Sequence, residues 1–94
     1  MALGATREVQ AELKARGWRV THGGALGEEY IPGPGRARLG SAYPDITAVK
    51  NGRTLRINTI DTLSDGLTPT AREAANAAKI RRLTGGHVLL VPKP

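Results

Sequence analysis

The chain has no cysteine and no phenylalanine, and its only aromatic residues are Trp18, Tyr30 and Tyr43. Without cysteine, the protein cannot form a disulfide, a zinc–thiolate site or a thiol nucleophile. With so few aromatic rings, the hydrophobic core has to be built from aliphatic side chains and alanine. These absences remove several classes of chemistry, but they do not assign the protein to a compartment.

Long apolar segments are also missing from the sequence. No run of about 18 apolar residues occurs, so the sequence predicts no membrane span. The first residues do not combine a basic segment with an apolar stretch, so we expect no signal peptide. Any export of the protein would then depend on something outside this chain.

Acidic residues are outnumbered, with 8 Asp and Glu against 14 Lys and Arg, which gives a net charge of +6. A field of this sign favours a polyanionic partner: nucleic acid first, an anionic membrane second and an acidic protein third. The charges are dispersed along the chain, which favours a folded basic surface over a disordered basic tail. A length of 94 residues predicts one domain, residues 1–94.

Two helices are expected. The first spans residues 6–16, with Thr6 as its N-cap and Gly17 at its end. The second starts at Thr68 and Pro69 and runs to about residue 83, where Gly85 stops it. Four alanines of the second helix are expected to lie on the sheet, and a neighbouring polar stripe to form either a substrate-facing surface or a solvated helix face. The alanines are Ala71, Ala74, Ala75 and Ala78, and the stripe is Arg72, Asn76 and Lys79.

Extended segments are expected at residues 18–21, at residues 28–31, in a hairpin that reaches residue 60 or 61, and at residues 87–91. The last of these is a nearly continuous apolar run, which predicts a strand buried on both faces. The resulting order is helix, one or two strands, hairpin, helix, strand. It predicts an α/β fold with a small mixed sheet whose last strand joins in parallel through the second helix.

The hairpin is the strongest local signal, because Asn51-Gly52 is a preferred pair for a two-residue type I′ turn. Pairing Val49 with Thr54 across this turn sets the rest of the register. Side chains alternate along a strand, so one face of the hairpin is polar and the other apolar. The polar face carries Asp45, Thr47, Arg56 and Asn58.

A loop rich in proline and glycine spans residues 32–40 and carries Arg36 and Arg38. It is equally consistent with a solvated surface loop and with a flexible flap that contacts phosphate groups. Pro32 ends the preceding extended segment, because proline cannot donate to a sheet ladder.

The αβββαβ order, with Pro44-Asp45 opening a central strand, resembles the PD-(D/E)XK nuclease superfamily. The resemblance implies that Asp45 binds a divalent metal such as Mg²⁺, together with Glu8 or Glu12 of the first helix. It places the second acid of the motif at Asn58 and its lysine at Ile60, and neither residue fits. An amide weakens a site for a hard cation. Candidates to supply the missing positive charge are Lys79, Arg72 and Arg56.

Segments 43–48, 58–62 and 68–77 are similar to the C-terminal toxin tips of bacterial contact-dependent growth inhibition and related polymorphic toxin systems. That resemblance implies secretion as the tip of a larger exported carrier and action in the cytoplasm of the target cell. It also implies cleavage of tRNA and neutralisation by a cognate immunity protein. The net charge of +6 leads us to expect an acidic surface on that partner.

The predicted reaction is cleavage of RNA, with tRNA as the expected substrate. With a metal, Asp45 and Glu8 or Glu28 would hold the ion and activate water. Without one, the RNA 2′-OH is the nucleophile, Asp45 or Glu28 is the base, and Arg56, Arg72 or Lys79 stabilises charge. Asn58 is a further ligand or substrate contact, Glu29 is an alternative to Glu28, and His22 is another candidate base. Substrate contacts are expected from Thr47, Arg72, Asn76, Arg36 and Arg38.

Two other functions remain open from the sequence. One is a metal-dependent DNase of the same fold. The other is a nucleic-acid-binding module that has kept the fold and lost the catalytic site.

Overall fold

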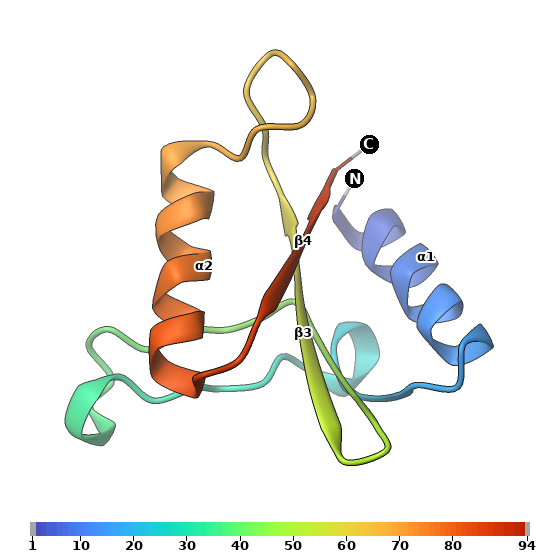
Figure 1. Cartoon of the computed structure of the whole chain (residues 1–94), viewed down its shortest axis with the longest axis horizontal. Helices are drawn as coiled ribbons and strands as arrows, with labels where there is room; N and C mark the ends of the chain where they lie inside the picture. Colours follow the sequence, from blue (N-terminus) through green and yellow to red (C-terminus); the bar gives the residue numbers. More distant parts are fainter. Residues whose placement is uncertain (1, 94) are drawn as a thin grey trace.

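The computed structural model describes the backbone of residues 2–93 and the side chains of residues 7–93. It contains two helices, α1 (Ala2–Ala15) and α2 (Ala71–Thr84), and four strands (Figure 1). The strands are β1 (Arg19–His22), β2 (Ile46–Lys50), β3 (Arg53–Ile60) and β4 (Val88–Pro92). Two short 3₁₀ turns, η1 (Gly24–Leu26) and η2 (Pro34–Arg36), lie in the long connection between β1 and β2.

The four strands form one sheet in the order β1-β2-β3-β4. The pairs β1–β2 and β2–β3 are antiparallel, and β4 joins β3 in parallel after the α2 crossover. The protein is therefore a small mixed α+β domain, and both the mixed sheet and its parallel last pair were predicted correctly. In the hairpin turn, Asn51 has φ 51° and Gly52 has φ 76°, the positive values that a type I′ turn requires.

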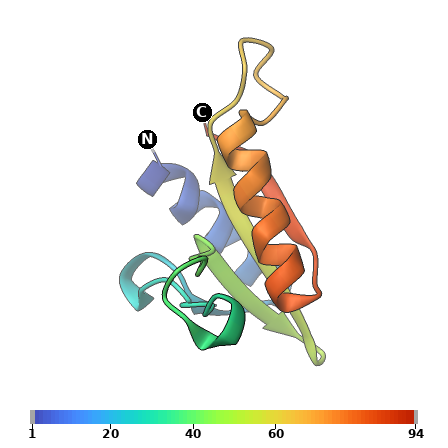
Figure 2. The same ribbon diagram turned by 90° about the vertical axis from the view of Figure 1, so that its left-hand side faces the viewer.

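The two faces of the sheet are covered differently, as Figure 2 shows in a view turned by 90°. On one face, Leu13 of α1 packs with Ile46, Ala48 and Ile57. On the other face, Ile80 of α2 lies in a second cluster with Ile31 and Ala42 of the β1–β2 connection. Because strand side chains alternate, this second face also carries the polar residues of the hairpin.

Both helix starts differ from the prediction. The backbone of α1 is helical from Ala2, so Thr6 lies inside the helix and does not cap it. The N-cap of α2 is Thr70, whose side chain accepts a hydrogen bond from the Glu73 N–H at 3.4 Å. Pro69 instead pairs with Thr62 in an isolated β-bridge, which delays the helix by two residues. The predicted stop is confirmed, since Gly85 caps α2 in the left-handed conformation.

The alanine face predicted for α2 is wrong. Ala71, Ala74 and Ala75 are exposed, whereas Ala77 and Ile80 are buried. Ile80 is the larger apolar side chain, and its full burial sets the rotation of the helix. The polar stripe is consequently turned toward the edge of the sheet's polar face.

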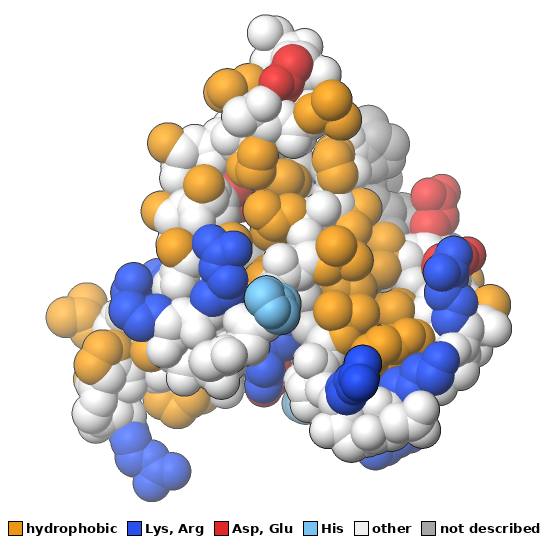
Figure 3. Space-filling view, viewed as in Figure 1, with side chains coloured by type: hydrophobic (Ala, Val, Ile, Leu, Met, Phe, Trp, Pro, Cys, Tyr) orange, Lys and Arg blue, Asp and Glu red, His pale blue; other side chains and the backbone are white. Residues whose placement is uncertain are grey.

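β4 is an edge strand rather than a strand buried on both faces. It pairs only with β3, and half of Leu89 is exposed. α1 packs against β1, β2 and β3, and on β4 Val91 reaches the cluster that contains Leu13 of α1, whereas Leu89 is left half exposed. Figure 3 shows the result, a band of hydrophobic side chains over the strands between the two helices.

The strand predicted at residues 28–31 is also wrong, because only Ile31 pairs, in an isolated bridge with Ala42. Residues 28–30 have no regular structure. They cross the polar face of the sheet and bring two acidic side chains to it. Within residues 2–93, neither helix is long and apolar enough to cross a membrane.

Candidate active site

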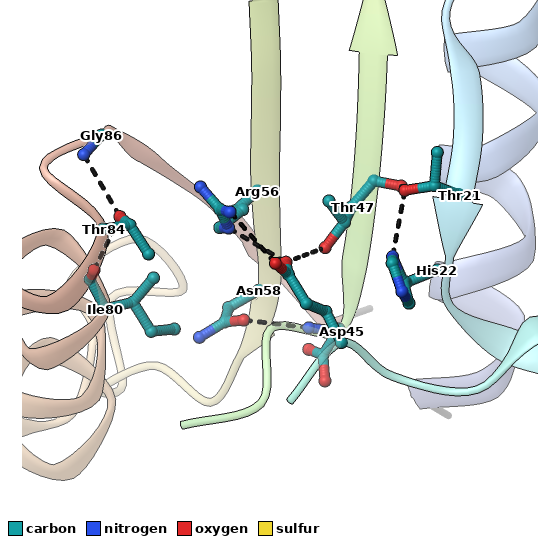
Figure 4. Close-up of polar contacts among 10 residues, drawn as sticks. Thr21, His22, Asp45, Thr47, Arg56, Asn58, Ile80, Thr84 and Gly86 are labelled. Carbon is teal, nitrogen blue, oxygen red and sulfur yellow. Dashed lines mark hydrogen bonds and ion pairs between the residues drawn. The ribbon is translucent and has the colours of Figure 1, made fainter. Parts of the chain in front are cut away.

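The register of the hairpin is the one predicted, with Val49 opposite Thr54 and Thr47 opposite Arg56. Beyond the regular pairs, the Asp45 N–H donates to Asn58 Oδ1 at 3.1 Å. Asp45 Oδ2 accepts from the N–H of Thr59 at 2.7 Å and from its hydroxyl at 2.9 Å. Figure 4 shows Asp45 and Asn58 side by side where β2 begins and β3 approaches its end.

Asp45 is held in place by Pro44, which precedes it, and by Gly23, which directly follows β1. Pro44 is fully buried and anchors the start of β2. Gly23, at φ 127°, lies against the Asp45 carbonyl, and a Cβ there would be 2.8 Å from that oxygen. The carboxyl group is therefore fixed by both its backbone and its hydrogen bonds.

Glu28 lies next to Asp45 and forms an acid pair with it. Partial burial, followed by the charge of Asp45 and a hydrogen bond to it, raises the pKa of the Glu28 carboxyl above its ordinary value of 4.5. A carboxylate with a raised pKa accepts a proton more readily than an ordinary surface glutamate, so it is a better general base. The structure thus brings together Asp45 and Glu28, two of the candidate acids named from the sequence.

A polar pocket of about 220 Å³ opens beside this pair. We call it the Asp45 pocket. Asp45, Asn58 and Thr59 form one wall, and α2 forms the opposite wall. Three residues of the first half of α2 line it, of which Arg72 and Asn76 were predicted from the sequence and Glu73 was not. Its remaining lining residues are Tyr43, Asp61 and Lys93.

Glu29 organises a second polar cluster on the same face of the sheet. Its carboxylate accepts from Arg56 through two bonds, Nε to Oε1 at 3.0 Å and Nη2 to Oε2 at 3.1 Å. Thr47 donates to the same Oε1 at 2.7 Å. Figure 4 shows Arg56 and Thr47 pointing toward one another from β3 and β2. These bonds, above all the one from Arg56, lower the pKa of Glu29, so this carboxylate stays ionised.

His22 lies at the edge of the Glu29 cluster. It is paired with Thr47 across the β1–β2 ladder, and its Nδ1 is 3.0 Å from the Thr21 hydroxyl. Its positive form would contribute to the field at Glu29, whose pKa it lowers slightly. The position is compatible with the candidate-base role expected from the sequence.

The other predicted basic residues line two neighbouring hollows. Lys79 shares one with Arg72 and Asn76 on α2, and its ammonium donates to the Ser41 carbonyl at 3.2 Å. Arg36 and Arg38 line another hollow with Tyr30 and Tyr43. Tyr43 therefore belongs both to this hollow and to the Asp45 pocket.

Glu8 is not brought to this site. It is exposed on α1, and that helix packs on the opposite face of the sheet. Glu12, the other acid considered on this helix, forms a surface ion pair with Arg16 at 2.7 Å. No acid of α1 lines the Asp45 pocket, and the helix acid that does line it is Glu73 of α2.

The donor set around Asp45 fits a divalent metal poorly. Within residues 2–93, no group of three or more His, Asp and Glu side chains is arranged to hold an ion. Asn58 Oδ1 and Asp45 Oδ2 already accept hydrogen bonds from main-chain N–H groups. Ile60, at the position of the motif lysine, is buried.

Sequence reasoning placed Glu29 only as an alternative to Glu28 and did not select Glu73, Asp61 or Lys93. The Asp61 N–H donates to the Glu73 carboxylate at 2.7 Å, and the Lys93 ammonium lies 3.4 Å from Asp61. These contacts join the end of β3 to α2 and to the end of β4. No local pattern signals them, because each links segments far apart in the chain.

No family model, no curated protein and no solved structure matches this chain.

Proposed function

We propose that the protein is an endonuclease that cleaves RNA by attack of the ribose 2′-OH on the adjacent phosphate. The observation that carries this proposal is the acid pair of Glu28 and Asp45 beside a pocket whose opposite wall presents Arg72. Glu28 adjoins Asp45, which lies in one wall of the pocket, and Arg72 lines the opposite wall. A base and a positive charge are the minimum that this reaction needs.

In the proposed reaction, the Glu28 carboxylate accepts the proton of the 2′-OH as that oxygen bonds to phosphorus. The bond from phosphorus to the 5′ oxygen breaks, which leaves a 2′,3′-cyclic phosphate and a 5′-hydroxyl. Burial, and after it the charge of Asp45, keeps the pKa of Glu28 raised. Asn58 and Thr59 position Asp45 through the hydrogen bonds described above.

Positive side chains stabilise the negative charge that develops on the phosphate oxygens. Arg72 lines the Asp45 pocket, and Lys79 lies about two helical turns further along α2 in the adjoining hollow. In this scheme the Lys79 ammonium gives its proton to the departing 5′ oxygen. Arg56 uses two of its nitrogens for Glu29, which leaves the N–H groups of Nη1 for another acceptor.

We derive no step through a metal ion, because the residues at Asp45 do not form a suitable ligand set. The topology is compatible with the PD-(D/E)XK core, but the second acid and the lysine of that motif fall at Asn58 and at the buried Ile60. The 2′-OH route needs neither group. Since DNA lacks this hydroxyl, the route also selects RNA over DNA.

The biological setting that we propose is that of a toxin domain. The domain would be exported as the tip of a larger carrier, act on tRNA in the cytoplasm of the target cell and be neutralised by an immunity protein. The net charge of +6 supports both partners, since tRNA and an acidic immunity surface are each attracted to it.

Incubation of the purified protein with total tRNA and with a plasmid, each with EDTA and with Mg²⁺, tests the reaction. We expect tRNA to be cut in both conditions, with 2′,3′-cyclic phosphate ends, and the plasmid to remain intact. Plasmid cleavage that requires Mg²⁺, with tRNA untouched, would instead support the metal-dependent DNase.

One observation favours a second candidate, a nucleic-acid-binding module without catalysis. Asp45 Oδ2 and Asn58 Oδ1 both accept main-chain N–H groups, so both side chains have a structural role. This candidate predicts RNA binding with no cleavage in any of the four reactions. It also predicts that removing the Glu28 carboxylate does not affect toxicity in a cell that expresses the domain.

The pH dependence of the cleavage rate should reflect the ionisation of Glu28. The base is active when ionised, so the rate should rise with pH along a limb whose midpoint lies above 4.5, because burial and Asp45 raise this pKa. Glu28→Gln should remove that limb and lower the plateau rate by about a hundredfold or more. Steady-state cleavage of a labelled RNA at a series of pH values measures both effects.

The raised pKa of Glu28 also makes the free energy of unfolding depend on pH. Glu28 binds its proton more tightly in the folded state than in the unfolded chain. Its protonation therefore stabilises the folded state fully below pH 4.5, and this stabilisation is lost as the pH rises through the folded pKa of Glu28. Glu28→Gln should therefore fold at least as well as the parent at neutral pH. An unchanged acid limb in this variant would show that another group is the base.

A further inference from the structure

Two of the three aromatic side chains of the protein stand together on its surface. The Tyr30 and Tyr43 ring centroids are 5.4 Å apart, and the ring planes are tilted by 49°. The exposed fractions are 44% for Tyr30 and 45% for Tyr43. Tyrosine is commonly intermediate in burial, but two half-exposed rings side by side leave aromatic surface available to a ligand.

The surroundings of the pair are basic and lead to the Asp45 pocket. Arg36 and Arg38 line the same hollow as the two rings, and no carboxylate is among the residues that line it. Tyr43 is also part of the Asp45 pocket. A molecule that contacts the rings would therefore extend directly toward the acid pair of Glu28 and Asp45.

We propose that Tyr30 and Tyr43 form a stacking platform for an unpaired base of RNA, with Arg36 and Arg38 on the flanking phosphates. Aromatic rings bind single-stranded nucleic acid because every base has a face that stacks on them, whereas a paired base is already stacked in its helix. The proposal names the substrate class of the proposed nuclease as single-stranded RNA, and it rests on that function only for the chemistry in the neighbouring pocket.

The position of the platform also gives it a role in catalysis. A base that is stacked on Tyr43 fixes the sugar to which it is attached, and the Asp45 pocket begins at the same residue. In-line attack by a 2′-OH requires the nucleotides on the two sides of the phosphate to be unstacked from one another. Holding one base against Tyr43 is a direct way to reach that geometry.

Fluorescence anisotropy in the Glu28→Gln background measures binding without cleavage. The probes are a fluorescein-labelled single-stranded RNA and a fully paired RNA hairpin, at one fixed salt concentration. Tyr43→Ala and Tyr30→Ala should each weaken binding of the single strand by roughly 5- to 150-fold, the range found when a stacking aromatic is removed. Binding of the hairpin should change much less.

Matched variants separate stacking from other effects. Tyr43→Phe keeps the ring and should keep the affinity for the single strand. Leu63→Ala should have no effect on that affinity, although it also removes an exposed apolar side chain. Leu63 lies in the connection before α2 and is 53% exposed. Arg36→Gln and Arg38→Gln should each reduce the slope of log affinity against log salt by about one.

Equal affinity of the parent and both alanine variants for single-stranded RNA would overturn the proposal. So would an equal loss for the single strand and the hairpin, since phosphate contacts alone would produce it. These outcomes are independent of cleavage. If the parent protein cuts no RNA but the tyrosine variants bind the single strand less tightly, the proposed reaction fails and the platform stands.

Discussion

Asp45→Asn is expected to lower the rate of RNA cleavage by about tenfold, part of the general-base contribution of Glu28, because Asp45 helps to raise the pKa of that base. The charge of Asp45 is one of the causes of the raised pKa of Glu28. Its removal should therefore move the acid limb of the pH profile downward, toward the ordinary value of 4.5. A full pH profile of cleavage, compared with that of the parent, measures the loss of rate and the shift together.

Asparagine is the informative replacement because it preserves an acceptor for the structural hydrogen bonds. Asp45 Oδ2 accepts from Thr59 N–H at 2.7 Å, and an amide oxygen can accept the same bond. The variant should consequently stay folded, which circular dichroism and a melting curve would verify. Asp45→Ala lacks the acceptor and would leave the buried Thr59 N–H unpaired. A loss of activity in that variant could then come from unfolding as well as from the missing carboxylate.

Asp61→Asn provides the matched control. Asp61 is an acid that lines the same pocket but is exposed and paired with Lys93. We expect its removal to change the rate by little, because surface pairs contribute little to stability and Asp61 has no assigned chemical role. Full activity of Asp45→Asn, or an equal loss in Asp61→Asn, would contradict the assignment of the acid pair.

Gly23→Ala should lower the free energy of unfolding by about 3 kcal/mol, from backbone strain and overpacking together. A Cβ at this position would lie 2.8 Å from the Asp45 carbonyl oxygen, 3.0 Å from Gln10 Nε2 and 3.3 Å from Ile46 Cα. The φ of 127° adds strain for any residue with a side chain. For a domain of this size, the loss corresponds to a melting temperature lower by roughly 10 °C or more.

The same substitution should impair cleavage at temperatures where the variant is folded. The atom that meets the new Cβ belongs to Asp45, so relief of the clash displaces the start of β2 and the acid pair with it. Small displacements of catalytic groups cost large factors in rate. Rate measurements well below the melting temperature separate this effect from unfolding.

Gly27→Ala is the control for backbone strain alone. Gly27 also has a positive φ, 77°, but a Cβ there would meet nothing within 4 Å. With ψ 156°, Gly27 lies in a region that essentially only glycine adopts, so the cost should be that of backbone strain alone, about 2 kcal/mol. If Gly23→Ala destabilises the protein no more than Gly27→Ala does, the close approach of Gly23 to Asp45 is not important for the site.

The local features of this fold could be predicted from the sequence. The Asn51-Gly52 turn, the pairing of Thr47 with Arg56, and the stop of α2 at Gly85 all follow from dihedral preferences of one or two residues. The stripe on α2 follows from helical spacing, and two of its members, Arg72 and Asn76, line the Asp45 pocket as expected. These features depend on neighbours within about one turn or one hairpin, and sequence patterns record such neighbours.

The predictions that failed concern packing between distant segments. Four alanines suggested the inner face of α2, but the burial of Ile80 against Ile31 and Ala42 sets the rotation of that helix. An apolar run suggested a strand buried on both faces, but α1 covers β1 to β3 and leaves half of Leu89 exposed. In both cases the outcome depends on which surface is available to pack against, and composition does not specify it.

The sequence by itself determined the polar face of the hairpin, its register and the basic charge of the domain. Only the tertiary structure decided which acids join that face. Residues 28–30 have no regular structure, so no periodicity in the sequence indicates where Glu28 and Glu29 point. Glu28 reaches Asp45 and Glu29 reaches Arg56 because the connection between β1 and β2 folds back over the sheet. The physical reason is that alternation fixes a side chain's direction within a strand, whereas an irregular segment takes its direction from the surface on which it lies.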